Sequence, residues 1–485
     1  MDYDIPAAGR PLVVRGATLS ATQVDALVAA LGRLLTPLGQ EEAHEQVSYC
    51  LRELIENAVR AVRKRRLFRK AGLDIADPAD YPRGLALLRE EEAAGAAPEA
   101  DPEDGGWVEV VLAPHPDRIV LRVSNAGQMV PAERLRVAQR LSAAQLYETF
   151  DEVVEQVEDD SESAGLGLAM LGMLLRRLGV PDDGFRFSSR EGETAFEIIL
   201  PLNLVSDEES DTLSDALLQE IETIPQVPHS IQSLRELLRD PDADFRALSR
   251  LIRRDPALTL EVLRMANSPV YRRNQRIESC EVALSLLGLR GLRGILDTFG
   301  ARKALESQYP APLLDRLWRH STDIAELAAA IGRQLGCPDD VIEAAYIGGL
   351  LHDVGQILLE GRHPDTYRAL QRHCEKKQAP AAAVESLIAG VNHARIGARM
   401  AEHWRLPERL AQAIRYGRAP LSAPEAARAC AQLIYLAHPV AHRLRGAAKE
   451  YDLDDTVFGR FGLEVPGGLE GLIERLGQAE SDPAL

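Results

Sequence analysis

Several features that would mark a special class of protein are missing from this sequence. Its 485 residues include only five cysteines, which lie far apart and form no Cys-x-x-Cys pair. This pattern argues against a disulfide framework or a structural zinc site and suits a reducing compartment. No apolar run approaches the roughly 20 residues that a membrane helix needs, and the N-terminus has neither the basic start nor the apolar core of a secretory signal. We therefore expect a cytoplasmic protein with no membrane span.

An excess of positive charge is missing as well. Acidic residues outnumber basic ones by 74 to 56, which gives a formal net charge of −18, so we expect no nucleic acid partner. One basic stretch, RAVRKRRLFRK at residues 60–70, ends a predicted helix and is followed by an acidic stretch at residues 90–104. We interpret the two as one exposed insertion in which the acidic segment offsets the basic one.

The chain is long enough for two or three domains, and its pattern changes near residue 206. Before that point, alternating strand patterns and intervening helices predict an α+β domain. After it, apolar residues recur at spacings of three and four, which is typical of successive amphipathic helices. We predict an α+β domain over residues 1–205, a linker over 206–211, an all-α domain over 212–445 and a helical tail over 446–485.

Three segments of the first half carry residue types that suit a nucleotide site. ELIENA, residues 53–58, places two polar residues four apart and hence on one helix face. VSNAGQMVP, residues 123–131, follows a predicted strand. SAGLGLAMLG, residues 163–172, has glycines that would let a backbone approach phosphates at a helix N-terminus. The candidate nucleotide-binding residues are Asn57, Asn125, Gly127, Gly165 and Gly167.

The order and spacing of these segments resemble the boxes of the GHKL ATPases, a family that includes histidine kinases and gyrase-type enzymes. The resemblance implies a GHKL-like sandwich with Mg-ATP as cofactor. It also implies that Asn57 would hold the magnesium ion and that Glu53 would orient water if the domain were an ATPase.

The boxes depart from the family at several positions. Asn125 stands where the family usually has the aspartate that reads adenine, and Met129 replaces a glycine. Residues 148–162 carry eight acidic side chains, which would repel a polyphosphate unless cations offset them. Two interpretations stay open, a degenerate domain kept for its shape and a domain that still binds Mg-ATP.

The second half resembles the HDOD family, the HD-related output domain of bacterial signalling proteins, from residue 224 to about residue 444. The resemblance rests on IPQVP at residues 224–228, the Asp255-Pro256 helix start, the Asn267-Ser268 helix end and GGLLHDVGQILL at residues 348–359. It implies an all-α domain that acts through protein–protein interaction. The implied partners are other signalling proteins, and a homodimer is left open.

The His-Asp pair inside GGLLHDVGQILL raises the question of a metal. Catalytic HD phosphohydrolases gather histidines and aspartates around metal ions that activate water. The resemblance places His393 among the further histidines, whereas Gly417 and Arg418 occupy a double-histidine position. Glycine offers no ligand and arginine no acceptor, so a two-metal phosphodiesterase is not supported. The candidate metal ligands are His320, His352, Asp353 and His438.

Two interpretations of the pair stay open. It is either an internal polar pair that stabilises helix packing or part of a single-ion site. The sequence as a whole predicts a signal-transduction regulator with a non-catalytic HDOD output and a degenerate GHKL-like domain that controls it. The alternatives are an atypical ATPase or protein kinase, in which Glu53 would be catalytic, and a metal-dependent phosphohydrolase.

Overall fold

A computed structural model provides the structure of the chain. It describes residues 10–35, 43–93, 105–146, 165–202, 204, 215–239, 245–268, 270–271, 277–377, 382–444, 458–459, 461, 463, 465 and 468–481. The predicted linker over 206–211 and the acidic residues 148–162 lie outside these ranges, as does most of the predicted tail before residue 468. The chain divides into two compact units, residues 1–212 with 369–388, and residues 213–368 with 389–485.

The first unit is built on a five-stranded antiparallel sheet in the order β1-β2-β3-β5-β4. Alternate residues of β2 and β3 are buried, which is the pattern of a sheet with one face on a core. The register places Asn125 of β3 opposite Thr194 of β5. The strands are β1 (Leu12–Gly16), β2 (Val108–Pro114), β3 (Arg118–Ala126), β4 (Phe185–Arg190) and β5 (Glu193–Pro201).

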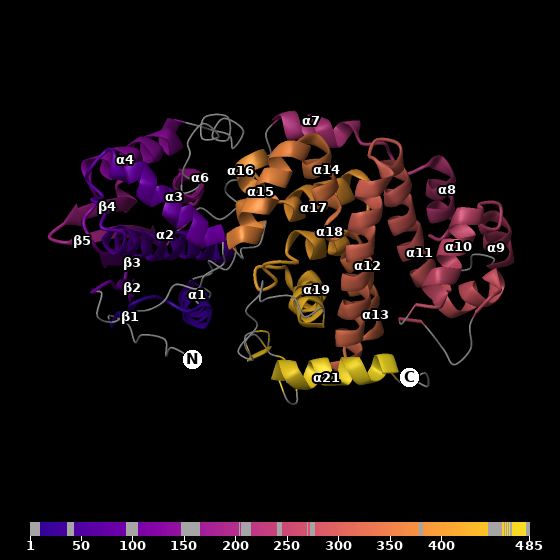
Figure 1. The fold of residues 1–485 in the computed structure, drawn as a ribbon. Helices are drawn as coiled ribbons and strands as arrows, with labels where there is room; N and C mark the ends of the chain where they lie inside the picture. The colour runs from indigo at the N-terminus through magenta and orange to yellow at the C-terminus, as the bar shows by residue number, and fades with distance from the viewer. Residues whose placement is uncertain are drawn as a thin grey trace. The chain divides into compact units, whose positions relative to one another are not determined.

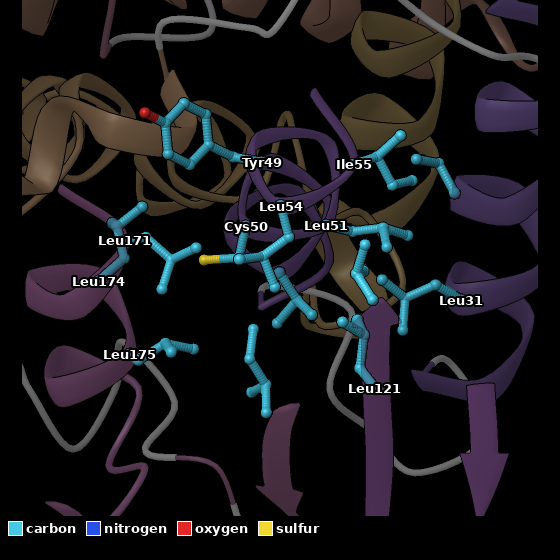
Figure 2. Packing of buried hydrophobic residues seen from close by; sticks show 14 of the residues in the cluster. Leu31, Tyr49, Cys50, Leu51, Leu54, Ile55, Leu121, Leu171, Leu174 and Leu175 are labelled. Carbon is cyan, nitrogen blue, oxygen red and sulfur yellow. The ribbon is translucent and has the colours of Figure 1, made fainter. Parts of the chain in front are cut away.

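Helices cover one face of this sheet, and α2 packs on β2 and β3 as well as against α1, α3 and α6 (Figure 1). The core between them is apolar, and each large side chain buried there contributes about 1.5–3 kcal/mol. Residues labelled in Figure 2 include Leu31, Tyr49, Leu54, Leu121 and Leu171. The helices of this unit are α1 (Ala21–Leu35), α2 (His44–Lys70), α3 (Asp80–Ala93), α4 (Pro131–Leu146), α6 (Gly165–Arg177) and α16 (Ala382–Ala389), with the 3-10 helix η3 (Asp182–Gly184).

A segment distant in sequence completes this core. Leu370 and Leu387 belong to the same buried cluster as the residues of α2. The hydroxyl group of Tyr49 lies 2.9 Å from Nε2 of His373. Residues 369–388, which the sequence pattern assigns to the helical half, thus belong to the first unit.

The insertion after α2 behaves in part as expected. Arg60 pairs with Glu92 at 2.8 Å, and Glu91 lies 3.2 Å from one further arginine of α2 and 3.4 Å from another. This confirms that acidic residues after position 90 offset the basic stretch. The insertion is not wholly exposed, however, because Phe68 and Leu88 are only 2% and 1% exposed.

The second unit is helical throughout its described residues, which confirms the all-α prediction. Helices α12, α13 and α19 pack against one another, and α17 packs against both α14 and α18 (Figure 1). Its helices are α7 (Asp215–Thr223), α8 (His229–Leu237), α9 (Phe245–Ile252), α10 (Pro256–Ala266), α11 (Cys280–Glu306), α12 (Ala311–Gln334), α13 (Asp339–Leu351), α14 (Val354–Arg362), α15 (Pro364–Lys377), α17 (His393–His403), α18 (Glu408–Arg415), α19 (Glu425–Leu444) and α21 (Gly468–Ser481). Helix α15 continues into the first unit.

Local sequence signals account for several of these helix ends. The carboxylate of Asp255 accepts hydrogen bonds from two backbone N–H groups of α10, and Pro256 is the first residue of that helix. The IPQVP segment is held by the end of α17, where Nε1 of Trp404 donates to the carbonyl oxygen of Pro225 at 3.1 Å. Among the described residues, every helix is too short or too polar to cross a bilayer.

Candidate functional sites

Glycines bring the elements of the candidate metal centre together. The His-Asp pair lies between the end of α13 and the start of α14. A Cβ atom on Gly349 would lie 2.7 Å from the Cα atom of Ala325 in α12, and one on Gly355 would lie 2.1 Å from the carbonyl oxygen of His393 in α17. Only glycine permits both approaches, so the GGLLHDVG motif sets the pair beside α12 and α17.

Three histidines from three elements gather at this point. Each of these histidines, His320, His352 and His438, offers one ring nitrogen, and the three nitrogens lie within 4.8 Å of one another. The ring centroids of His352 and His438 are also 4.8 Å apart. The carboxylate of Asp353 lies beside them, with Oδ2 3.4 Å from Nε2 of His320 and Oδ1 3.3 Å from Nε2 of His393. The structure therefore brings the three predicted histidine ligands together, with the fourth predicted ligand, Asp353, beside His320 and His352.

This cluster is largely removed from water. His352, Asp353 and His438 are each 4% exposed, whereas the side chain of His320 is 31% exposed. Burial acts to raise the pKa of Asp353, but His352 and His393 outweigh it and hold that pKa well below its usual value. Burial, followed by the charges of His352 and Arg418, holds the pKa of His438 well below its usual value. The cluster thus combines an ionised carboxylate with a neutral imidazole.

His352 turns one ring nitrogen toward the carboxylate. Its Nδ1–H group donates to the carbonyl oxygen of Gly349 at 2.7 Å, and Nε2 of the same ring lies 3.0 Å from Oδ1 of Asp353. Both atoms are buried, and Oδ1 also lies 3.3 Å from Nε2 of His393. The contact between Nε2 and Oδ1 is closed either by a proton on Nε2 or by a cation that both atoms bind.

The arrangement fits a metal ion. A histidine that donates one ring N–H to a carbonyl oxygen and turns the other nitrogen to the site is typical of metal ligation. Imidazole and carboxylate ligands suit zinc, iron or manganese. His320, His352, Asp353 and His438 would hold one such ion, which would supply a Lewis-acidic positive charge.

A second candidate site lies in the first unit, where a cavity of about 120 Å³ opens beside α2. Asn57 and Asn125 line it, as the nucleotide prediction expects, but Glu53 does not. Glu53 is 1% exposed, its Oε1 atom accepts a hydrogen bond from Nδ2 of Asn57 at 2.9 Å, and a Cβ atom on Gly167 would lie 2.0 Å from Oε1. The structure therefore places Glu53 and Gly167 in close contact, and neither residue lines the cavity.

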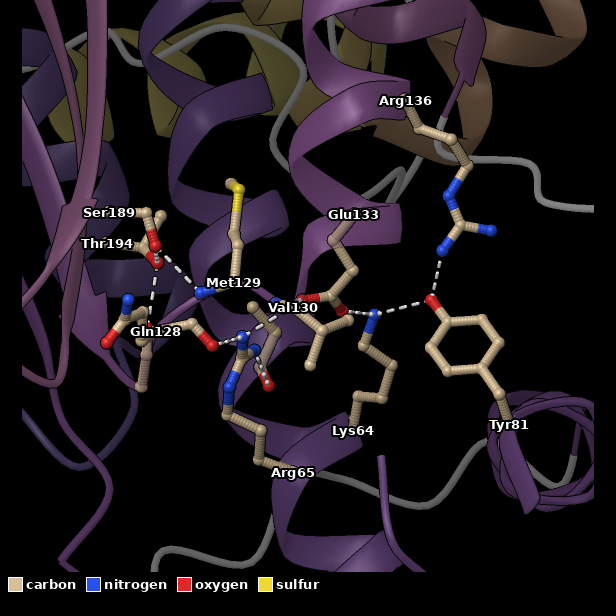
Figure 3. A network of polar contacts seen from close by, with 12 residues as sticks. Lys64, Arg65, Tyr81, Gln128, Met129, Val130, Glu133, Arg136, Ser189 and Thr194 are labelled. Carbon is tan, nitrogen blue, oxygen red and sulfur yellow. Dashed lines mark hydrogen bonds and ion pairs between the residues drawn. The ribbon is translucent and has the colours of Figure 1, made fainter. Parts of the chain in front are cut away.

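The remaining nucleotide candidates lie around this cavity without lining it. Gly165 is the first residue of α6. Gly127 has a φ of +105° and accepts a hydrogen bond at its carbonyl oxygen from the hydroxyl group of Thr194 at 2.7 Å. Ser189 lies 3.1 Å from Thr194 and accepts from the backbone N–H of Met129 at 2.7 Å (Figure 3).

Sequence reasoning missed several residues of this cavity. Thr194 lines it, and the signal was a buried polar residue within an otherwise apolar strand. Lys64 and Arg65 also line it, although the sequence suggested a solvated helix end. Both contact Glu133 of α4, and Arg65 does so at 3.2 Å (Figure 3). Glu133, the carboxylate among the described lining residues, is thus paired with both cations.

Comparison with known proteins identifies the helical half. Residues 224–420 match the model of the HDOD domain. An uncharacterized protein of Treponema pallidum (strain Nichols) is 30% identical over 394 residues, which cover 81% of this chain and 76% of the relative. The solved structure of an HDOD domain protein of unknown function from Geobacter sulfurreducens is 24% identical, with a TM-score of 0.43, over 56% of this chain and 89% of that one.

The chain thus contains an HDOD domain, which spans residues 224–420. The match to the Treponema pallidum protein is longer than this domain. The two chains therefore share sequence outside the HDOD domain as well.

Proposed function

We propose that this protein is a signal-transduction regulator whose HDOD domain binds a single metal ion and acts by protein–protein interaction rather than by hydrolysis. The observation that carries the proposal is the convergence of three imidazole rings on one point beside a buried carboxylate, with Nε2 of His352 3.0 Å from Oδ1 of Asp353. One cation held by His320, His352, Asp353 and His438 would bind the facing nitrogen and oxygen atoms and tie α12, α13 and α19 together.

We expect no hydrolysis because the chain lacks the ligands that a second metal ion would need. A two-metal site would need histidines where Gly417 and Arg418 stand. Arg418 brings a permanent positive charge, and that charge already acts on His438. A second metal ion there would be repelled rather than bound.

Metal analysis of the purified, untagged protein tests the proposal. We expect one transition-metal ion per chain in the wild type and less than about a tenth of that in His438→Ala, because even a residue that only orients a metal ligand typically contributes about 10–100-fold in affinity. His229→Ala is the matched control, because His229 is exposed on α8. A wild-type protein with no stoichiometric metal would contradict the proposal.

A single-ion phosphohydrolase is the second candidate, and one observation favours it. The side chain of His320 is 31% exposed, so the cluster is open to solvent on one side. Release of p-nitrophenol from p-nitrophenyl phosphate by the wild type, lost in Asp353→Asn, would support this candidate. We expect no such release.

For the first unit, we propose a degenerate GHKL-like domain over residues 1–205 that controls the HDOD output over residues 212–445. The sheet with helices on one face, and the position of Asn57 and Asn125 at one cavity, support this proposal. Because Glu53 contacts Gly167 instead of the cavity, we expect no ATP hydrolysis. An ATPase rate that Asn57→Ala abolishes would contradict this expectation and favour the ATPase alternative.

A further inference from the structure

The second unit has a groove of about 820 Å³ that is lined by residues of α10, α11, α12 and α13. Phe299 and Leu350, which are buried, contribute apolar surface to its lining. Leu260 of α10 also lines the groove and is 68% exposed, more than any other large apolar side chain of the described residues. Covering Leu260 would favour association with another molecule, because apolar surface would leave water.

The groove carries no net charge, in contrast to the chain as a whole. Four acidic and four basic side chains line it, whereas the formal charge of the chain is −18. Two copies of a chain with this charge repel each other, and they approach most readily through a face where the charges balance. The groove is therefore suited to contact with a second copy of this chain.

Most of the charged side chains of the groove are already paired within the chain. The guanidinium group of Arg264 binds the carboxylate of Glu261. The carboxylate of Glu306 lies 3.3 Å from the guanidinium group of Arg302 and 2.7 Å from Nζ of Lys303. These ion pairs compensate one another, which argues against a highly charged small ligand.

Asp315 and Arg319 of α12 are the exceptions. The side chain of Asp315 is 63% exposed, and its ion pair with Arg302 is long, at 3.8 Å. Arg319 is exposed and contacts no carboxylate in the part of the chain that the structure describes. Its Nε–H group donates to the backbone carbonyl oxygen of Asp315 at 3.2 Å. Residues four apart lie on the same face of a helix, so α12 presents one acid and one base side by side.

We propose that this groove is the interface of a homodimer, in which α12 packs against α12 of a second copy about a twofold axis. An axis that crosses α12 midway between Asp315 and Arg319 sets Asp315 of each copy opposite Arg319 of the other. The contact is self-complementary, with two identical ion pairs. Trp318, which lines the same groove, lies near the axis, and aromatic residues at the centre of an interface commonly supply much of the binding energy.

Sedimentation velocity of the full chain over a series of concentrations tests the proposal. We expect a monomer–dimer equilibrium with a Kd of about 1–100 µM, at the weak end of the range for protein interfaces. Asp315→Arg and Arg319→Asp should each weaken dimerisation at least about 10-fold, because each variant sets like charges opposite each other twice around the axis.

An equimolar mixture of the two variants gives the sharpest result. Asp315→Arg supplies two basic residues and Arg319→Asp supplies two acidic ones, so a mixed dimer regains both ion pairs. We expect this mixture to dimerise about as the wild type does, and we expect the same of the chain that carries both substitutions. A mixture that stays monomeric would overturn the proposal.

Two further variants test the apolar part of the interface. Leu260→Asp should weaken dimerisation at least about 10-fold, because it places a charge in the contact. Val282→Asp is the matched control, because Val282 of α11 is also exposed, at 54%, but does not line the groove. Its dimerisation should match that of the wild type, and an equal effect of both substitutions would overturn the proposal.

A wild type that remains monomeric at about 500 µM, well above the expected Kd, would also overturn it and leave the groove to a different protein. The inference adds a partner and a surface to the proposed function but does not depend on the metal ion. Oligomeric state and metal content are measured separately, so either proposal can fail while the other stands.

Discussion

Nε2 of His352 and Oδ1 of Asp353 lie 3.0 Å apart, both buried, with the histidine proton directed to the carbonyl oxygen of Gly349 instead. A lone pair on Nε2 that faced the carboxylate would cost about 1–3 kcal/mol. A cation bound by both atoms, as the proposed function requires, would offset this cost. The predictions that follow test this account and the packing around it.

Removing the metal should destabilise the protein. A ligand that binds the folded state at 100 times its dissociation constant adds about 2.7 kcal/mol of stability, which corresponds to about 5–10 °C in Tm for a domain of this size. We expect a chelator to lower the Tm of the wild type by that amount. The Tm of His438→Ala should already be low and should not respond, and an equal response in both proteins would contradict the account.

The approach of α14 to α17 depends on Gly355. A Cβ atom there would lie 2.1 Å from a backbone oxygen, so Gly355→Ala must displace a helix, at a cost of about 1–3 kcal/mol or more. Gly348→Ala is the matched comparison, because its Cβ atom would meet the flexible end of Ile434 at 2.9 Å and the Cβ atom of Ala413 at an ordinary contact distance of 3.7 Å. Alanine also favours a helix over glycine, so Gly348→Ala should cost less than about 1 kcal/mol. Urea unfolding measures the free energy of unfolding of both variants. An equal loss of stability in the two variants would contradict the argument that α14 and α17 approach closely at Gly355.

Glu133 should stabilise the first unit in a pH-dependent way. Burial acts to raise the pKa of Glu133, but Lys64 and Arg65 outweigh it and lower that pKa overall. A carboxyl group with a lowered pKa in the folded state contributes stability above its unfolded pKa of about 4.3, and this contribution is lost as the pH falls through the folded pKa.

We therefore expect Glu133→Gln to be about 1–3 kcal/mol less stable than the wild type at pH 7, with a difference that shrinks as the pH falls below about 4. The control is Glu193→Gln, because the pair of Glu193 with Arg122 is exposed and worth less than about 1 kcal/mol. A difference for Glu133→Gln that stays constant from pH 7 to pH 3 would contradict the ion-pair account.

Much of the helical half could be predicted from sequence because its signals are local. Asp255 before Pro256 marks a helix start, and the spacing of apolar residues marks the helices that follow. The four candidate ligands were predicted from a family pattern, and the structure gathers them at one point. The close contact between His352 and Asp353 could not be predicted, because it depends on which ring nitrogen meets the carbonyl oxygen of Gly349.

The cavity of the first unit was less predictable, because its contacts are distant in sequence. Lys64 and Glu133 are 69 residues apart, and no periodic pattern connects them. Tyr81 lies on an insertion that composition alone marks as exposed. Only the register of β3 with β5 places Asn125 opposite Thr194, and only the structure shows that Glu53 packs on Gly167.

X-ray absorption at the metal edge of the purified, untagged protein is the most direct test of the central claim. The account predicts one transition-metal ion per chain, bound by three imidazole nitrogens and a carboxylate oxygen, with no sulfur ligand. It also predicts that the imidazole signal falls in His438→Ala and stays unchanged in His229→Ala. A protein that carries only trace metal, or one whose metal is bound by cysteine sulfur, would contradict the account.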